Sequence, residues 1–287
     1  MRLLTDRTIT EALRCPICRA AMAVRESGSL VCTGPRTHCF DFGASGYVNL
    51  SRPGQSGGGD SKQAVRARSQ FLNLDHYRPV ADGICALLHT HVQNATGLVL
   101  DAGCGEGYYS DRIAAEGFAT FGVDLSKFAV DAAAKRASAA ERANAFYAVS
   151  SVYELPVADG SVAAVTNVFA PCAEEEYARV LQDDGILLVA HAGEAHLLGL
   201  KRVLYAETHL NTPRADLPKG MIAVDERRVQ YDITVEGSES IKSLFAMTPY
   251  YWRTSPTDAE KLSGLVSLTT EVDILLTVYR KKGGAGE

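Results

Sequence analysis

The sequence predicts an α/β protein with a doubly wound, parallel sheet and a small metal-binding segment ahead of it. Three observations carry this prediction. Short apolar runs alternate with helical patterns from Leu98 onward, a glycine-rich turn follows the first run, and a Cys-x-x-Cys pair stands near the N-terminus. Strictly alternating strands and helices are typical of parallel sheets with right-handed crossovers.

The length and composition suit one large domain and one small one. The chain has 287 residues, of which 46% are hydrophobic and 22% charged, as in ordinary globular proteins. No apolar run approaches the roughly 20 residues that span a bilayer, so we expect no membrane partner. An odd set of seven cysteines without a signal-peptide pattern favours metal ligands and reduced thiols in a cytoplasmic protein over a disulfide framework.

Charge is distributed unevenly along the chain, whose net charge is -5. Residues 1–100 hold 11 Lys+Arg and 7 Asp+Glu, a net +4, so residues 101–287 carry -9. An excess of basic side chains in the N-terminal third suits a nucleic-acid partner on that face, although many ordinary domains carry as much.

We divide the chain into residues 1–52 (the cysteine-rich segment), 53–97 (linker and helices) and 98–287 (the large α/β unit). The stretch 53–59 contains four glycines in seven residues, which predicts a flexible connection. Asp60 and Ser61 are suited to cap a helix that carries Arg66, Arg68 and Phe71, and a second helix is expected over 80–92.

The large unit should contain five central strands separated by helices. Strands are expected at 98–101, 120–124, 146–149, 162–168 and 185–190. Helices are expected at 108–115, 126–139, 174–181 and 195–205. Two later strands, at 229–235 and 272–279, should extend the sheet.

The N-terminal segment carries a candidate zinc site. Cys15 and Cys18 can grip one side of a metal from a tight turn, and Cys32 with His38 or Cys39 can complete a tetrahedron. Thiolate and imidazole ligands favour Zn²⁺, and a segment of about 50 residues gains stability from a structural metal. The alternatives are free buried thiols or a redox pair. Four protein ligands would close the site, so the zinc should be structural.

The turn Asp101–Gly107 carries a candidate cofactor site. Glycines at 103, 105 and 107 let the backbone turn sharply and approach a ligand, and Asp124, about 20 residues later, can accept hydrogen bonds from a ribose diol. The Gly-x-Gly-x-Gly spacing differs from that of dinucleotide binders. Glu106 would repel a pyrophosphate but not a sulfonium, which favours S-adenosylmethionine over NAD.

These motifs resemble those of a known family. Asp101 to Tyr109 is similar to motif I of the class I methyltransferases, and the chain as a whole resembles the RlmA-type 23S rRNA (guanine-N1-)-methyltransferases. Further matching segments are Cys15–Cys18, Cys32, His38–Asp41, Gly46–Leu50, Phe71–Leu72, His76–Pro79, Phe169–Cys172, His196–Leu197, Leu200–Lys201, His209 and Met247–Pro249. The segment from Cys32 to His38 is longer than usual. We choose His38 over Cys39 because the family places its histidine two residues before the Phe-Asp pair.

The resemblance implies a Rossmann-like methyltransferase sheet and methyl transfer from S-adenosylmethionine to guanine N1 in the hairpin 35 loop of 23S rRNA. It implies that the zinc segment helps to hold the RNA and suggests a homodimer. It also places Tyr77, the Gly105–Glu106 backbone and His209 around the cofactor, with Ser151 in the adenine-side loop. The cofactor-binding set is therefore Tyr77, Asp101, Gly103, Gly105, Glu106, Gly107, Asp124, Ser151 and His209.

Several roles stay open at this point. The base that removes the N1 proton is not identified; His209 is one candidate, and Asn167 is a candidate substrate contact at a strand end. Cys104 and Cys172 are expected to be packing residues. The cations available for RNA are Arg14, Arg19, Arg36, Arg52, Lys62, Arg66 and Arg68.

Two other functions compete with the preferred one: a methyltransferase of small molecules, which would not need the basic zinc segment, and a non-catalytic ribosome- or RNA-binding module, which would not need the intact loop with Asp124. The sequence does not say which guanine is chosen or whether methylation confers macrolide resistance.

Overall fold

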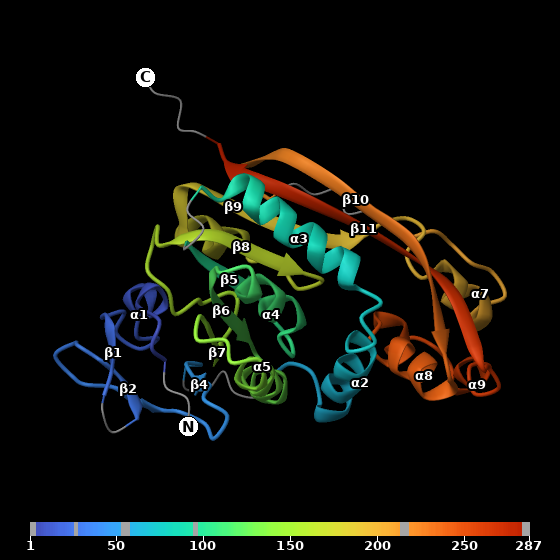
Figure 1. The fold of residues 1–287 in the computed structure, drawn as a ribbon, viewed down its shortest axis with the longest axis horizontal. Helices are drawn as coiled ribbons and strands as arrows, with labels where there is room; N and C mark the ends of the chain where they lie inside the picture. The colour runs from blue at the N-terminus through green and yellow to red at the C-terminus, as the bar shows by residue number, and fades with distance from the viewer. Residues whose placement is uncertain (1–3, 26–27, 53–57, 94–96, 213–217, 283–287) are drawn as a thin grey trace.

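The computed structural model describes residues 4–25, 28–52, 58–93, 97–212 and 218–282 (Figure 1). The described helices are α1 (Arg7–Ala12), α2 (Lys62–Leu72), α3 (Arg78–His91), α4 (Tyr108–Ala115), α5 (Lys127–Ala139), α6 (Glu174–Val180), α7 (Leu198–Leu204), α8 (Ser238–Ala246), the 3-10 helix η1 (Pro249–Trp252) and α9 (Pro256–Glu260). The described strands are β1 (Met22–Val24), β2 (Ser29–Cys32), β3 (Cys39–Asp41), β4 (Val48–Asn49), β5 (Leu98–Ala102), β6 (Ala119–Asp124), β7 (Ala145–Val149), β8 (Val162–Val168), β9 (Leu181–Ala192), β10 (Met221–Glu236) and β11 (Ser267–Lys281).

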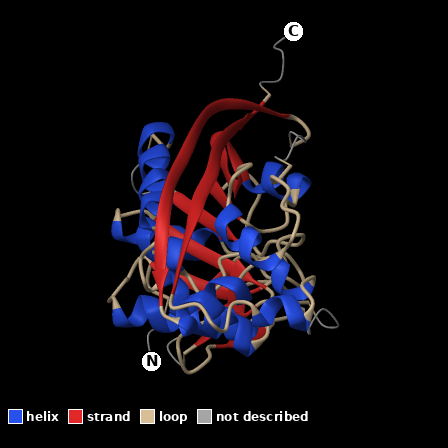
Figure 2. Cartoon of the chain, turned by 90° about the vertical axis from the view of Figure 1, so that its right-hand side faces the viewer, coloured by secondary structure: helices blue, strands red, loops and turns tan. Residues whose placement is uncertain are grey.

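The main sheet has the strand order β10-β11-β9-β8-β5-β6-β7-β4. The strands from β4 to β9 pair in parallel, whereas β11 pairs antiparallel with β9 and β10 pairs antiparallel with β11. Helices lie on both sides of the sheet (Figure 2). The predicted doubly wound α/β architecture is confirmed, and so is the extension of the sheet by the two C-terminal strands. Chain order reverses at β5, where β6 and β8 lie on opposite sides, and ligands bind at such a point in open α/β sheets.

Among the described residues before Leu50, β1, β2 and β3 form a small sheet that packs against the main sheet, and β4 belongs to the main sheet itself. Leu13 forms a β-bridge with Val157, and β4 pairs in parallel with β7 at the sheet edge. Leu4, Ile9, Leu13 and Leu30 share one hydrophobic cluster with residues of β5 and β6. The segment therefore buries its apolar side chains against the sheet rather than in a core of its own, and the boundaries at 52 and 97 stay a prediction.

The predicted flexible linker, 53–59, lies partly outside the described residues. Its last residue, Gly59, has a φ of +92° and packs against the backbone of Ser126, two residues after the end of β6. The carbonyl of Asp60 accepts a hydrogen bond from the Ser126 hydroxyl at 2.7 Å. Ser61 caps α2 as predicted, with its hydroxyl accepting from the Ala64 amide. This end of the linker is thus held against the carboxyl end of β6.

The C-terminal region differs most from the sequence prediction. The predicted strands 229–235 and 272–279 are parts of a long hairpin, and α8, η1 and α9 are inserted at its tip. In Figure 1, α8 lies beside α2, and α9 lies on the far side of α8. The predicted helix 195–205 is only α7, and the strand expected at 185–190 begins earlier, at Leu181. No helix of the described chain is long and apolar enough to cross a membrane.

Candidate active site and zinc centre

The glycine loop follows β5 at the point where the strand order reverses. Gly103, Gly105 and Gly107 have φ values of +84°, +54° and +77°, a region that side chains rarely adopt. A Cβ at Gly103 would lie 2.5 Å from the Cβ of Ala170, so a side chain there would collide with the turn after β8. The loop thus needs glycine both for its conformation and for its close packing.

Asp124 ends β6 beside this loop. Its carboxylate accepts a hydrogen bond from the Gly105 amide at 3.1 Å and another from the Ser126 amide at 2.7 Å. Burial raises the pKa of Asp124, whereas these two amides favour its charged form. The carboxylate is fixed in orientation and partly exposed, which fits the predicted contact with a ribose diol.

Asp101, also predicted at the cofactor, is only 2% exposed. It accepts hydrogen bonds from the hydroxyls of Ser110 on α4 and Thr166 on β8. Burial raises the pKa of Asp101 to about 6. In this structure Asp101 fixes the start of the glycine loop, because its carboxylate joins the end of β5 to α4 and to β8.

Glu106 is 3% exposed, and Arg68 of α2 pairs with it. The same guanidinium pairs with Asp60 and lies above Gly105, where a Cβ would be 3.1 Å from an Arg68 nitrogen. Arg68 is therefore engaged within the chain, not free for RNA. The pairing also offsets the charge of Glu106, so the repulsion we invoked against a pyrophosphate is weaker than the sequence suggested.

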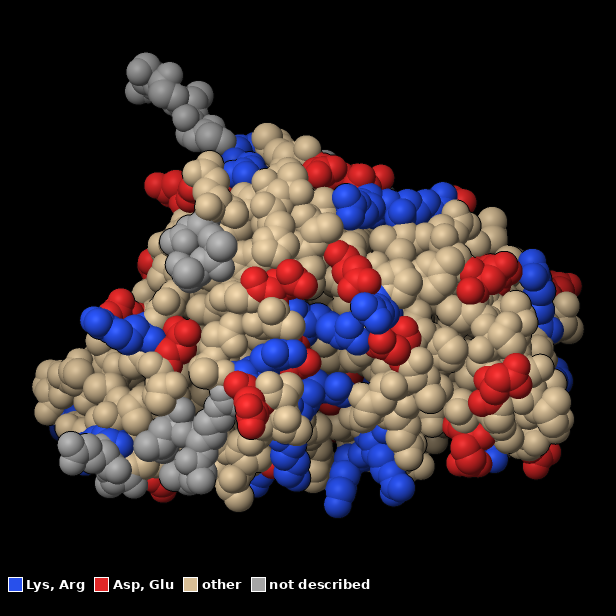
Figure 3. Space-filling model, viewed as in Figure 1, with Lys and Arg blue, Asp and Glu red and all other residues tan. Residues whose placement is uncertain are grey.

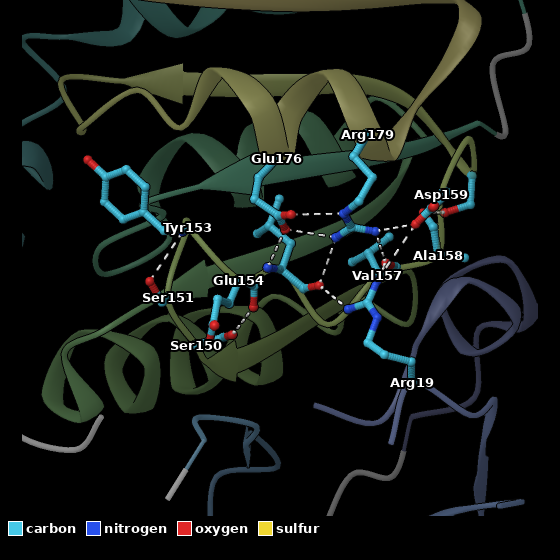
Figure 4. Close-up of polar contacts among 12 residues, drawn as sticks. Arg19, Ser150, Ser151, Tyr153, Glu154, Val157, Ala158, Asp159, Glu176 and Arg179 are labelled. Atoms are coloured by element: carbon cyan, nitrogen blue, oxygen red, sulfur yellow. Dashed lines mark hydrogen bonds and ion pairs between the residues drawn. The ribbon is translucent and has the colours of Figure 1, made fainter. Parts of the chain in front are cut away.

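Ser151 lies in the loop after β7, where its hydroxyl accepts from the Tyr153 amide at 3.2 Å (Figure 4). Two arginines from other parts of the chain donate hydrogen bonds to main-chain carbonyls of this loop. Arg19, from the Cys15–Cys18 turn, donates to the carbonyls of Leu155 and Val157, both at 2.9 Å. Arg179 of α6 donates to the same two carbonyls, at 3.1 and 2.8 Å. The sequence proposed Arg19 only as an RNA contact and did not propose Arg179 at all.

The other two predicted cofactor residues lie in different surroundings. Tyr77 is 1% exposed, and burial raises the pKa of its hydroxyl. That hydroxyl lies 3.3 Å from Nε2 of His196. His209 is exposed in the segment after α7, where its carbonyl accepts from Lys201 at 3.0 Å. The roles of Tyr77 and His209 at the cofactor stay predictions.

Asn167, the candidate substrate contact, is held within the chain through its amide nitrogen, and a role toward the substrate stays a prediction. It is 1% exposed, and its amide nitrogen donates to the Pro171 carbonyl at 2.8 Å and to the Tyr177 hydroxyl at 2.9 Å. Both hydrogens of the amide are used. Asn167 therefore shapes the turn after β8.

The structure brings Cys15, Cys18, Cys32 and His38 together at one end of the small sheet. Their ligand atoms all lie within 4.8 Å of one another. Nδ1 of His38 lies 3.6 Å from Sγ of Cys15 and 3.4 Å from Sγ of Cys32, and the thiols of Cys18 and Cys32 are 3.6 Å apart. A tetrahedron of three sulfurs and one nitrogen around zinc has edges of about 3.5–3.8 Å, and the three distances lie within about 0.2 Å of these edges. These donors therefore fit the ion.

Two further features suit a metal at this cluster. The amide of His38 donates to Sγ of Cys32 at 3.2 Å, and this bond is the main reason that the pKa of Cys32 falls to about 6, whereas burial raises the pKa of Cys15 to about 11. Thiolate is the form that binds metals. Cys39, the rival ligand, is exposed on β3 and lies outside the cluster. The arrangement supports the choice of His38.

Three of the seven cations proposed for RNA have no ion-pair or side-chain hydrogen-bond partner among the described residues: Arg36, Lys62 and Arg66. The other four are engaged. Arg14 donates to main-chain carbonyls nearby, Arg52 pairs with Glu154, and Arg19 and Arg68 make the contacts given above.

Comparisons with known proteins agree with this geometry. Residues 13–55 match the family model described as RlmA, N-terminal, and residues 99–185 match a methyltransferase domain. The 23S rRNA (guanine(748)-N(1))-methyltransferase of Streptomyces fradiae is 31% identical over 93% of this chain and 96% of its own length. The "Putative 23S rRNA (guanine-N(1)-)-methyltransferase YxjB" of Bacillus subtilis is 29% identical over 92% of this chain and 95% of its own length.

Among solved structures, the YcgJ protein of Bacillus subtilis is 17% identical, with a TM-score of 0.45 over 69% of this chain and 97% of its own. The two family models establish a methyltransferase sheet that uses S-adenosylmethionine and a zinc ribbon with a structural zinc ion. Similarity to the Streptomyces fradiae enzyme along nearly the whole length shows that this chain belongs to the 23S rRNA (guanine-N1)-methyltransferase family, with an RlmA-type zinc ribbon at its N-terminus.

Proposed function

We propose that this protein transfers a methyl group from S-adenosylmethionine to N1 of a guanine in the hairpin 35 loop of 23S rRNA. The observation that carries the proposal is the alignment with the Streptomyces fradiae enzyme over both parts of the chain, the zinc ribbon and the methyltransferase sheet. The glycine loop beside Asp124 supplies the cofactor site that this reaction needs.

The chemistry divides between the cofactor and the chain. S-adenosylmethionine supplies an electrophilic methyl group, and guanine N1 must lose a proton as it is methylated. The chain's part is to fix the two reactants in line at near-attack distance. We propose that Asp124 orients the ribose, that the loop Gly103–Gly107 approaches the methionine portion, and that Ser151 lies on the adenine side. No residue is assigned as the proton acceptor.

We also propose that the zinc ribbon and α2 grip the RNA phosphates. The unpartnered cations Arg36, Lys62 and Arg66 support this, because a side chain without an internal ion pair is free to bind phosphate. In Figure 3, Lys and Arg side chains gather along the lower edge of the face, whereas those in its middle lie among Asp and Glu side chains. The resemblance further suggests a homodimer, which light scattering would test, and rRNA as substrate suggests action in the cytoplasm.

The test is methyl transfer from labelled S-adenosylmethionine to 23S rRNA and to an isolated hairpin 35 oligonucleotide, with the product located by mass spectrometry. The expected product is 1-methylguanosine in the loop. A matched hairpin with adenine in place of the modified guanine should accept no methyl group. Labelling outside hairpin 35, or only on small molecules, would contradict the proposed substrate.

A further inference from the structure

The turn after β8 presents an aromatic ring at the carboxyl edge of the sheet. Phe169 follows the last residue of β8, is 48% exposed and has a φ of +55°. A bulky residue in this left-handed region is uncommon and persists only where the surrounding structure holds it. The Phe169 amide donates to the Ala190 carbonyl on β9 at 3.1 Å, so the residue is anchored between two central strands.

Buried polar groups lock this turn from below. Asn167 donates to the Pro171 carbonyl and to the Tyr177 hydroxyl, and that hydroxyl donates to the same carbonyl at 3.0 Å. Asn167 and Tyr177 are 1% and 0% exposed. Hydrogen bonds in such a buried network rigidify what they hold. The position of the Phe169 ring is therefore preset before any substrate arrives.

A second ring backs Phe169 from inside the protein. The imidazole of His196 stacks on it, with centroids 6.1 Å apart and an interplanar angle of 12°. The Asp273 amide donates to Nδ1 of His196 at 3.3 Å. Nδ1 is then an acceptor, so the proton of the neutral ring is on Nε2 and faces the Tyr77 hydroxyl. Phe169 thus rests on a fixed, buried ring while about half of its own side chain stays exposed.

The ring is next to the cofactor loop. Ala170, the neighbour of Phe169, packs so closely on Gly103 that a Cβ there would lie 2.5 Å from its own. A base held against Phe169 would therefore lie at the reversal point of the sheet, beside the loop that approaches the methyl donor.

From these contacts we propose that Phe169 is the stacking platform for the target guanine, extruded from its loop into the site. The inference rests on the proposed function and names a substrate-binding residue for it. Enzymes that act on a base take it out of its stack and hold it against aromatic side chains. An exposed, rigid ring beside the methyl donor meets that need, whereas an ordinary surface position would not favour a phenylalanine with positive φ.

The test compares Phe169→Leu, which keeps an apolar side chain, with Phe169→Tyr, which keeps the ring. Ile222→Ala, an exposed apolar position at the start of β10, serves as the control. The RNA is hairpin 35, used unmodified for kinetics and with 2-aminopurine at the target position for fluorescence. Because base–aromatic stacking is worth roughly 1–3 kcal/mol, kcat/KM for RNA should fall about tenfold or more in the leucine variant.

The tyrosine and control variants should stay within about threefold of the wild type. Wild type and Phe169→Tyr should quench 2-aminopurine on binding, and Phe169→Leu should not. Affinity for S-adenosylmethionine, measured by calorimetry, should be unchanged in all variants. The stacking role would be overturned if Phe169→Leu kept the wild-type kcat/KM and still quenched 2-aminopurine. It would also be overturned if the affinity of this variant for S-adenosylmethionine fell as much as its kcat/KM for RNA. A wild type that leaves hairpin 35 unmethylated overturns the proposed function itself, before any variant is compared.

Discussion

The guanidinium of Arg19 donates a hydrogen bond to the carbonyl of Val157 at 2.9 Å, which ties the zinc-binding turn to the loop after β7 (Figure 4). Arg19 directly follows Cys18, has a φ of +60°, and its amide donates to the Cys15 carbonyl at 2.8 Å. The turn that positions two candidate zinc ligands therefore also positions Arg19. This contact therefore joins the segment that carries the candidate zinc ligands to the loop after β7.

We expect Arg19→Ala to destabilise the protein by about 1 kcal/mol, because Arg179 still donates to the same carbonyls and Arg19 is partly exposed. Urea unfolding measures this change. Arg36→Ala, which removes a cation of the same small sheet without a described partner, should change stability by less than 0.5 kcal/mol, as is usual for exposed positions. Equal effects of the two variants would show that the Arg19 contacts add nothing.

The zinc ligands are tested by a pair of cysteine variants. Cys32→Ser should abolish zinc binding, whereas Cys39→Ser should retain about one zinc per chain, because only Cys32 belongs to the cluster. Metal analysis measures both. Since the ribbon shares a hydrophobic cluster with β5 and β6, loss of zinc should lower the midpoint of a single thermal transition.

Two separate transitions in Cys32→Ser would instead show that residues 1–52 fold independently, as the predicted boundary implies. Zinc loss in Cys39→Ser would contradict the choice of His38.

Local pattern predicted the central sheet well, because buried parallel strands are continuous apolar runs and each is bounded by a turn or an acidic residue. The glycine loop and Asp124 were found for the same reason: their spacing along the chain sets their meeting in space. Spacing indicated Cys15, Cys18 and Cys32 of the zinc cluster but left the fourth ligand open, and only the family resemblance favoured His38 over Cys39.

Contacts between distant segments left no local signal. Nothing near Arg68 in the sequence shows that it pairs with Glu106, and nothing near Arg19 shows that it reaches Val157. The sequence analysis found parts of both long strands but not the helices α8, η1 and α9 between them. It predicted only 229–235 of β10 because most side chains of that strand are exposed and form no continuous apolar run. Phe169 matched the family motif without a role until its backbone angle and stacking partner were seen.

The free energy of unfolding should decrease as the pH is lowered, because of His196. Burial lowers its pKa to about 4 in the folded protein, against about 6.5 when unfolded. As the pH is lowered, His196 is therefore protonated in the unfolded chain before it is protonated in the folded protein. The stability that the neutral His196 contributes is complete above pH 6.5 and is lost as the pH falls toward 4. Asp101, with its pKa raised to about 6, acts in the opposite direction, with its contribution lost as pH rises through 6.

A variant separates the two groups. Between pH 7.5 and 5.0, the free energy of unfolding should fall by about 2 kcal/mol more in the wild type than in His196→Gln, which cannot be protonated. Two charged groups act on His196: the pKa of Asp273 is lowered, first by its hydrogen bonds from Arg228, and burial lowers the pKa of Lys201. Parallel pH profiles in wild type and variant would contradict the assignment.

The pair Arg68–Glu106 should be cooperative. Arg68→Met leaves a carboxylate that is 3% exposed without its partner and should cost about 3 kcal/mol. Glu106→Gln should cost less, because Arg68 keeps Asp60. The double variant Arg68→Met with Glu106→Gln should be more stable than Arg68→Met alone. Urea unfolding of all four proteins gives the coupling energy, and strict additivity would show that the pair does not interact.

Asp124→Asn tests the cofactor site most directly. In the wild type, the two carboxylate oxygens of Asp124 accept hydrogen bonds from the Gly105 and Ser126 amides. The substitution keeps the size of the side chain but removes its charge and replaces one of these acceptor oxygens by a donor. Charge-assisted hydrogen bonds are worth about 1.5–3 kcal/mol each, so affinity for S-adenosylmethionine should fall at least tenfold by calorimetry. Asp183→Asn, a change at an exposed carboxylate on β9, should leave the affinity unchanged. If circular dichroism shows an intact fold and Asp124→Asn still binds with wild-type affinity, the ribose contact must be assigned to another residue.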